Sequence, residues 1–387
     1  MEHPALFILN DAIANITQIM EKHTTEPHWQ DPHCILIVLT VIGGDIIRSA
    51  LASLTSHSTF TPVAFSFGWV AYSFSALLSK VGDGHLMPAP DCGAILVNAH
   101  SGYSRAISSW PLARIVRDHQ PPDNRQDGLT ITFYRTRTDK ATGVPDRDGV
   151  YYFGVLVIVM QFAIASMPGV LYGSWSVFVV TLFGTILVQM NSALGQWYDE
   201  KWSGGSVQKG SEVVCITRGN GDSNVQVVIT GEGGMKLEHI ATGRIVSRRA
   251  TTPITFLLAT LWLLHLVTVE RFHAYTWFSI IIGALGMLQN AVAATVKRSP
   301  GALGFHLKQE GVVHEKKVFA ALQAAEEVEH KVGLSLMPIF FPGELRETEK
   351  RWMESKSLEY TRDKQALAVQ TASSSADDPN VYRLRPR

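Results

Sequence analysis

Six long apolar runs, separated by blocks rich in charged residues, constrain this chain more than any other feature. A helix needs about 20 predominantly apolar residues to cross the hydrocarbon core of a bilayer, and each run is close to that length. We therefore predict a mainly α protein, a polytopic membrane helical bundle of about six transmembrane helices. The runs are Cys34–Leu54, Val63–Ser79, Val150–Met167, Trp175–Leu194, Pro253–Val269 and Tyr275–Val296, of which Val63–Ser79 is the weakest.

Lysine and arginine are distributed unequally among the connections between these runs. Ser58–Pro62 and Pro168–Ser174 contain neither, and Arg271 stands alone in the third short connection, whereas the connections 80–149 and 196–252 are rich in basic residues. Basic loops remain on the cytosolic side of a membrane. We therefore expect an integral, multi-pass protein of the endoplasmic reticulum, with both termini and both long loops in the cytosol.

The segments outside the apolar runs contain further predicted elements. Residues 1–32 carry apolar side chains at helical spacing and predict an interfacial helix, while both long loops contain short β-branched runs between Gly, Asn and Asp turns. We expect one small cytosolic β-rich subdomain built from both loops, then C-terminal helices in 297–363 and a disordered tail in 364–387. The paired transmembrane segments occupy 33–79, 150–195 and 253–296. Strands are predicted at Ala94–Asn98, Leu129–Arg135, Glu212–Thr217, Val225–Thr230 and Leu237–Ala241, and helices at Trp110–Asp118, Val313–Val332 and Glu344–Leu358.

This chain lacks the sequence motifs of several classes of catalytic and binding site. Its three cysteines are widely separated, which excludes a disulfide framework and a cysteine-based zinc site. Nucleotide-binding glycine loops, nucleophile elbows, zinc-protease helices and the aspartate-rich diphosphate pattern are all missing. Asp83, His85 and Asp91 lie close in sequence, but their spacing fits no metal motif, and turn chemistry accounts for the two aspartates. We therefore expect no metal and no cofactor, and no basic stripe indicates a nucleic-acid partner.

Asp45 stands in the middle of the first apolar run. A charged group at that depth costs roughly 2.5–3.5 kcal/mol on insertion scales, so something must compensate it or use it. Arg48 follows at i+3 and can neutralise it in a purely structural ion pair. The alternative is an acid held in a dry, apolar chamber, with Gly43 and Gly44 opening the helix to a substrate.

Aromatic and polar residues in the other runs suggest a binding wall or simple packing. If Val63–Ser79 is helical, Phe65, Trp69 and Tyr72 share one face, which either packs against a neighbouring helix or stabilises a cation where water is excluded. His265 and Glu270 are nearly one turn apart near the lumenal end of the fifth run, and Glu270 is a second candidate acid. The amides of Gln161, Gln189, Asn191, Gln289 and Asn290 predict hydrogen bonds between helices.

Three stretches resemble a known group of proteins: GGDIIRSALASL (Gly43–Leu54), PVAFSFGWVAYSFSALLSKVGDGHLMP (Pro62–Pro88) and NAHSGYSRAISSWPLARIVRD (Asn98–Asp118). They resemble fungal integral-membrane proteins of meroterpenoid biosynthesis, in particular the membrane-bound type II terpene cyclases of the macrophorin kind. The resemblance implies protonation of an alkene or epoxide on a farnesylated aromatic, followed by ring closure. The partners would be a lipophilic prenylated small molecule, membrane lipid and possible biosynthetic partner enzymes.

The residues themselves provide the site hypothesis, because the resemblance supplies no catalytic motif. We assign Asp45 as proton donor and Glu270 as reserve donor or final base. Phe65, Trp69 and Tyr72 would stabilise the cation, and Arg48 and His265 would complete the binding site.

Two other classes fit the same sequence. A transporter or channel would use the buried charge as a relay, although it favours interrupted helices in two related halves, and the glycine interruption occurs in one run only. A non-catalytic membrane scaffold would use Asp45 and Arg48 as a packing pair and present its cytosolic subdomain to a partner enzyme.

Overall fold

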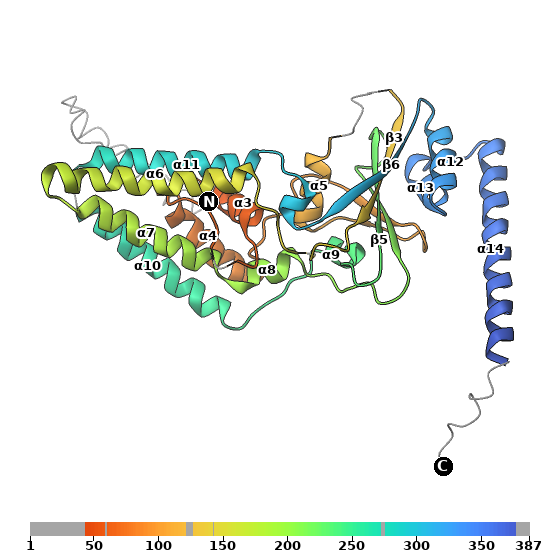
Figure 1. The fold of residues 1–387 in the computed structure, drawn as a ribbon, viewed down its shortest axis with the longest axis horizontal. Coiled ribbons are helices and arrows are strands. Elements are labelled where there is room, and N and C mark those ends of the chain that lie inside the picture. Colours follow the sequence, from red (N-terminus) through yellow and green to blue (C-terminus); the bar gives the residue numbers. More distant parts are fainter. Residues whose placement is uncertain (1–42, 59, 121–126, 142, 272–274, 377–387) are drawn as a thin grey trace, which may run out of the picture.

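The computed structural model describes residues 43–58, 60–120, 127–141, 143–271 and 275–376. Within these ranges it is about half helical, with 12 α-helices and one six-stranded sheet. Figure 1 shows a bundle of long helices beside a sheet domain, with the C-terminal helix projecting beyond the sheet. A largely helical chain with a β-rich part is therefore confirmed, while the interfacial helix predicted in 1–32 lies outside the described residues.

The bundle is built around four long helices: α6 (Gly149–Tyr172), α7 (Ser176–Ser192), α10 (Thr251–Arg271) and α11 (Thr276–Thr295). Three of them, α6, α10 and α11, are long and apolar enough to cross a membrane, and α7 makes a fourth if it is joined to α8 (Gly195–Lys201) across a bend of 43°. Their outer faces expose large apolar side chains, for example Val170 at 73% and Phe256 at 63%. The expected count of six spans is not confirmed within the described residues.

The first two apolar runs do not form long helices where the structure describes them. Helix α3 (Gly44–Leu54) has 11 residues and α4 (Trp69–Gly82) has 14. At 1.5 Å per residue they are about 16 Å and about 21 Å long, which is short of a hydrocarbon core of about 30 Å. The run Val63–Ser79 is divided, because its first residues are extended and only Trp69 begins the helix. The start of the first run, residues 34–42, lies outside the described residues.

Buried basic side chains hold the C-terminal end of α3 at the end of the bundle that faces the sheet domain. Nζ of Lys201 donates to the carbonyl oxygens of Ser53 at 3.2 Å and Thr55 at 2.9 Å, and Nη1 of Arg298 donates to Ser53 at 2.6 Å. The last carbonyls of a helix have no partner within it and are stabilised by cations. Ser58 therefore lies at the same end as the basic loops, whereas hydropathy placed the Ser58–Pro62 connection at the opposite end.

A segment without helix or strand, residues 61–66, runs through the core between α3 and α4, and we call it the extended segment. Because a backbone outside helices and strands leaves most of its polar groups unpaired, side chains of the long helices must bind them where water is excluded. Gln189 exchanges two hydrogen bonds with Thr61 (3.2 and 3.0 Å), and Gln289 accepts from the amide N–H of Ala64 at 2.9 Å and donates to Pro62 at 3.0 Å. Gln189 and Gln289 therefore bind this segment rather than a partner helix, which corrects their predicted role.

Gln161 and two glycines complete the surface on which the extended segment packs. Nε2 of Gln161 donates to the carbonyl oxygens of Phe65 at 2.7 Å and Ile282 at 2.9 Å, so it joins the segment to α11. Gly154 and Gly286 let the backbone approach closely, since a Cβ at either position would overlap a carbonyl oxygen of the segment. The extended segment and the buried faces of α3 and α4 thus form the interior of the bundle, while Leu78 and Val81 of α4 are exposed.

The sheet domain combines strands from both long connections with one strand from the C-terminal part. The strand order is β2-β1-β4-β5-β3-β6, with β3 and β5 parallel and the other pairs antiparallel. The strands are β1 (Ile95–Asn98), β2 (Ser104–Ala106), β3 (Leu129–Thr136), β4 (Glu212–Thr217), β5 (Asn224–Thr230) and β6 (Leu307–Glu315). Four of the five predicted strands are confirmed.

Two predictions in this domain are wrong. Leu237–Ala241 is the short helix α9, in which Leu237, Ile240 and Ala241 are buried at helical rather than alternating spacing. Val313–Val332 is not one helix, because its first residues extend β6 along β3 and only Val318 begins α12 (Val318–Val328). The predicted helix Trp110–Asp118 is confirmed as α5.

Alternation along the central strands gives the sheet two buried faces. Val97, Val213 and Val227 pack with α12 and with α13 (Val332–Phe340), whereas Leu96, Val214 and Val228 belong to the apolar core that continues into the bundle. The last helix, α14 (Glu347–Ala376), contributes Trp352 and Met353 to the first of these faces. The sheet is therefore packed directly on the end of the bundle, and this junction holds the candidate site.

Candidate functional site

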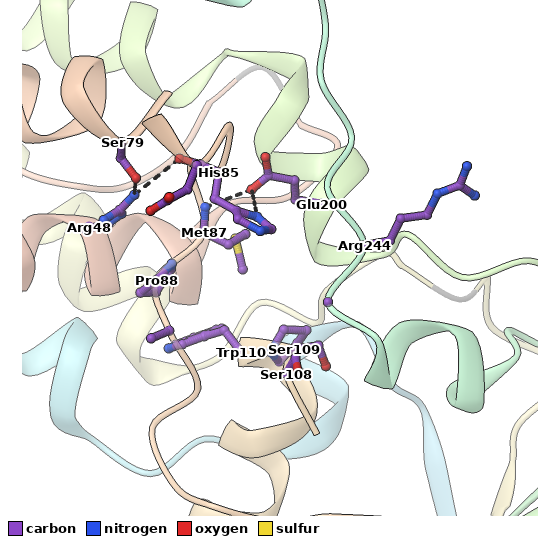
Figure 2. A pocket seen from close by; sticks show the side chains of 14 residues that line it. Arg48, Ser79, His85, Met87, Pro88, Ser108, Ser109, Trp110, Glu200 and Arg244 are labelled. Carbon is purple, nitrogen blue, oxygen red and sulfur yellow. Dashed lines mark hydrogen bonds and ion pairs between the residues drawn. The ribbon is translucent and has the colours of Figure 1, made fainter. Parts of the chain in front are cut away.

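A cavity of about 250 Å³ lies where the bundle meets the sheet domain. Figure 2 shows side chains converging on it from segments far apart in the sequence. Arg48 comes from α3, His85 from the connection after α4 and Glu200 from α8, while Ser109 and Trp110 come from the start of α5. The cavity thus joins an acid, an imidazole and a guanidinium that are up to 152 residues apart, since 200 − 48 = 152.

Arg48 is fixed in this cavity by the chain that leaves α4. Its Nε donates to the carbonyl oxygen of Leu86 at 2.8 Å, and its Nη2 donates to Oγ of Ser79 at 2.5 Å and to the carbonyl oxygen of His85 at 3.3 Å. These contacts hold the planar guanidinium in one orientation and leave Nη1 without a partner among the described residues.

Asp45 does not join this arrangement. Its side chain is exposed, and none of the hydrogen bonds or ion pairs between described residues connects it to Arg48. Both sequence hypotheses for Asp45, an ion pair and an enclosed acid, therefore need correction. Asp45 lies in the first turn of α3, where the positive end of the helix dipole stabilises a carboxylate without any ion pair.

Glu200 is the buried acid of the cavity, with 5% of its surface exposed. Its Oε2 accepts from the backbone N–H groups of Leu86 at 2.9 Å and Met87 at 2.8 Å, and its Oε1 accepts from Nε2 of Gln196. Three donors compensate the carboxylate for its lost water. Glu200 thereby fixes the connection that carries His85.

His85 is partly open to solvent, with one third of its side chain exposed. Its Nδ1 lies 3.9 Å from Oε2 of Glu200, so a protonated ring would form an ion pair with this carboxylate. Histidine is the side chain that most often acts as a general acid or base. His85 is therefore the candidate proton donor of the cavity.

Helix α5 forms the facing wall and is anchored on the end of α11. Arg114 is fully buried and donates to the carbonyl oxygens of Ala294 at 2.6 Å and Val296 at 2.7 Å, and its Nε binds Asp118 at 2.8 Å. Trp110 Nε1 donates to Asp91 Oδ1 at 3.0 Å. The N-terminal end of α5 is thus held rigidly at the cavity.

The aromatic residues predicted as a binding wall lie deeper in the bundle and pack on each other. Phe65 and Trp69 both stack on Trp262, with centroids 6.1 and 5.7 Å apart, and Tyr72 contacts Trp69 edge-on at 5.1 Å. His265 makes an edge contact with Phe65 at 5.6 Å. All four predicted residues are buried, and Phe65 reaches the cluster from the extended segment rather than from a shared helix face.

The other predicted ligands are not brought together. Glu270 belongs to α10, but its side chain lies outside the described residues. Among the described residues, no three His, Cys, Asp or Glu side chains gather at metal-binding distance, so Asp83, His85 and Asp91 do not form such a cluster.

Sequence reasoning missed Glu200 and Ser109. Glu200 stands just after the fourth apolar run, and an acid at the end of such a run is one available signal. Ser109 precedes Trp110 and Pro111 in the pattern of a helix N-cap, which marks a helix start but not a site.

No protein-family model, curated protein or solved structure matches this chain, so its function is argued from geometry.

Proposed function

We propose that this chain is a multi-pass membrane enzyme that closes rings on a prenylated small molecule, with the substrate's polar end in the junction cavity. The observation that carries the proposal is the convergence of Arg48, His85 and Glu200 on one cavity beside a bundle whose outer surface is apolar. A prenyl chain can remain in contact with apolar surface while its polar end reaches these groups. Membrane enzymes acting on amphiphilic substrates need this combination.

In the membrane, α6, α7 with α8, α10 and α11 would span the bilayer, in place of the six spans expected from hydropathy. The extended segment and α4 would enter from the sheet-domain side and return to it, so they need not span. Irregular backbone at membrane depth is tolerated when protein surrounds it, and the amides of Gln161, Gln189 and Gln289 meet that condition here. The connections 80–149 and 196–252 are rich in basic residues, which favours a cytosolic position for the sheet domain that they build. This is the arrangement expected of a protein of the endoplasmic reticulum.

In this mechanism His85 replaces Asp45 as the proton donor. When the prenyl chain folds back so that its far end also reaches the cavity, protonated His85 donates its proton to the oxygen of an epoxide at that end, and that C–O bond breaks. The π electrons of the neighbouring alkene form the new C–C bond, and the neutral imidazole of His85 accepts the proton that the final cation loses from carbon, which restores the protonated ring. The product is an isomer of the substrate, and no oxidant, reductant or cofactor is consumed.

Glu200 and Arg48 have distinct roles in this mechanism. Glu200 orients His85 and stabilises its protonated ring through the 3.9 Å contact, so it is a positioning residue. Arg48 presents its free Nη1 edge to the substrate's polar group. An epoxide suits this donor better than an alkene, because an imidazolium is too weak an acid to protonate an unactivated carbon.

The test is conversion of a farnesylated phenol epoxide by yeast microsomes that contain the protein. We expect a product of unchanged mass and shifted retention time. His85→Gln should abolish it, while Asp45→Asn, a change of the same kind on the exposed acid, should retain most of it. An inactive Asp45→Asn variant beside an active His85→Gln variant would return the donor role to Asp45. Failure to convert any of several prenylated phenols and their epoxides would favour the scaffold.

A further inference from the structure

The wall of the junction cavity opposite His85 and Glu200 is built from the N-terminal end of α5 (Figure 2). The first turn of a helix presents N–H groups that have no acceptor within the helix, and in α5 these are the N–H groups of Trp110 and Leu112, because Pro111 has none. Ser109 occupies the N-cap position, and yet its side chain makes no capping hydrogen bond. The expected internal acceptor for these N–H groups is therefore not used.

The Ser109 hydroxyl is itself unsatisfied. Ser109 is 4% exposed, it lines the cavity, and its Oγ has no hydrogen-bond partner among the described residues. A buried hydroxyl without a partner costs about 1–3 kcal/mol unless a ligand supplies one. The hydroxyl and the first-turn N–H groups lie at the same helix end, and both are suited to an oxygen acceptor.

Positive charge also lies around this cavity. Arg48 contributes a guanidinium with its Nη1 edge free, and Arg244 stands at the rim. The two carboxylates of the lining are Asp83, which is exposed, and Glu200, whose oxygens are bound by Leu86, Met87 and Gln196. Because Glu200 is engaged by its own donors, the α5 wall can accept a further anion.

We propose that the first turn of α5 and the Ser109 hydroxyl bind an oxyanion of the ligand, a carboxylate or a phosphate, while Arg48 neutralises it. This inference rests on the proposed function, since it specifies the polar end of the same substrate. A carboxylated aromatic ring or a phosphorylated prenyl chain carries such a group, and both sources present the same oxygen chemistry to the site.

The experiment measures binding to the purified full-length protein in detergent by isothermal titration. The probes are a farnesylated hydroxybenzoate, the matching farnesylated phenol and farnesyl monophosphate. We expect at least one anion to bind about tenfold more tightly than the phenol, as one charge-assisted hydrogen bond provides. Whichever anion binds more tightly identifies the source. Equal affinity for the phenol and both anions would overturn the inference.

Two serine variants assign the effect to the proposed wall. Ser109→Ala should reduce anion affinity about tenfold and leave phenol affinity unchanged. Ser108→Ala is the matched control, because Ser108 lines the same cavity but is exposed and does not occupy the N-cap. Equal loss in both variants, or none in Ser109→Ala, would contradict the assignment. Arg48→Lys keeps the positive charge and therefore tests whether anion affinity depends on the guanidinium itself.

The two proposals can fail separately. Cyclisation of the neutral phenol epoxide without any preference for an anion would refute the oxyanion site and leave the enzyme intact. Ser109-dependent binding of the anion with no turnover of any substrate would keep the site and refute the cyclase.

Discussion

The close approach between Gly286 and the extended segment makes a demanding test of the bundle interior. A Cβ at Gly286 would overlap the carbonyl oxygen of Phe65 and lie 2.8 Å from Nε2 of Gln161. Gly286→Ala must therefore push the segment away from α11 and break the 2.7 Å hydrogen bond between Gln161 and Phe65. The Phe65 carbonyl is part of the backbone, and Nε2 of Gln161 is held by two hydrogen bonds, so local adjustment is costly.

The expected loss follows from two contributions. An unsatisfied buried carbonyl costs about 1–3 kcal/mol, and overpacking of a filled core adds about 1–3 kcal/mol. We therefore expect Gly286→Ala to reduce the free energy of unfolding by about 2–6 kcal/mol. Gly149→Ala is the matched control, because that helical glycine has no atom within 4 Å of the added Cβ and should gain up to about 1 kcal/mol.

The assay is unfolding of the purified protein as SDS replaces a mild detergent, followed by circular dichroism. Gly286→Ala should unfold at a clearly lower SDS fraction than the wild type, and Gly149→Ala should not. Equal stability of the two variants would refute the extended segment as the filling of this core.

Two further predictions concern the end of the bundle at the sheet domain. Burial alone would raise the pKa of Asp148, but the hydrogen bonds and charge of Arg298, at 2.8 Å to each carboxylate oxygen, lower it below its ordinary value. Since the pKa of Asp148 in the folded protein lies below that in the unfolded chain, its stabilisation is present above the unfolded pKa and is lost as pH falls through the folded pKa. Asp148→Asn should therefore flatten the acid side of a profile of thermal stability against pH. An unchanged profile would contradict this. In sealed microsomes, cysteines introduced at Ser58 and at Lys209 should be equally accessible to an impermeant maleimide, whereas a cysteine at Ser174 should show the opposite accessibility. If the cysteine at Ser58 behaves like the one at Ser174, the topology expected from hydropathy is restored.

Periodicity and apolar length predicted the long helices and most strands, because these elements depend on local patterns. The same local patterns failed for Val63–Ser79, whose apolar composition is equally suited to a buried extended segment and a helix. What distinguishes the two are the amide donors of Gln161 and Gln289, which come from helices distant in the sequence.

The candidate site shows a similar division. The i+3 spacing suggests Asp45 as the neighbour of Arg48, whereas the structure gives it Ser79, and the sequence indicates no partner for His85. The long-range contacts of Arg48 with Ser79 and of Glu200 with Leu86 decide the site, and neither pair shares a sequence pattern. The exposure of Asp45 likewise follows from where α3 begins rather than from its apolar surroundings.

The most direct test of the junction cavity as the reaction site is photoaffinity labelling with a farnesylated phenol that carries a diazirine on its ring. Crosslinks are expected in the peptides that contain His85 to Met87 and Ser108 to Trp110, with competition by the unmodified phenol. Crosslinks confined to the peptide around Asp45, or to the aromatic cluster at Trp262, would contradict it.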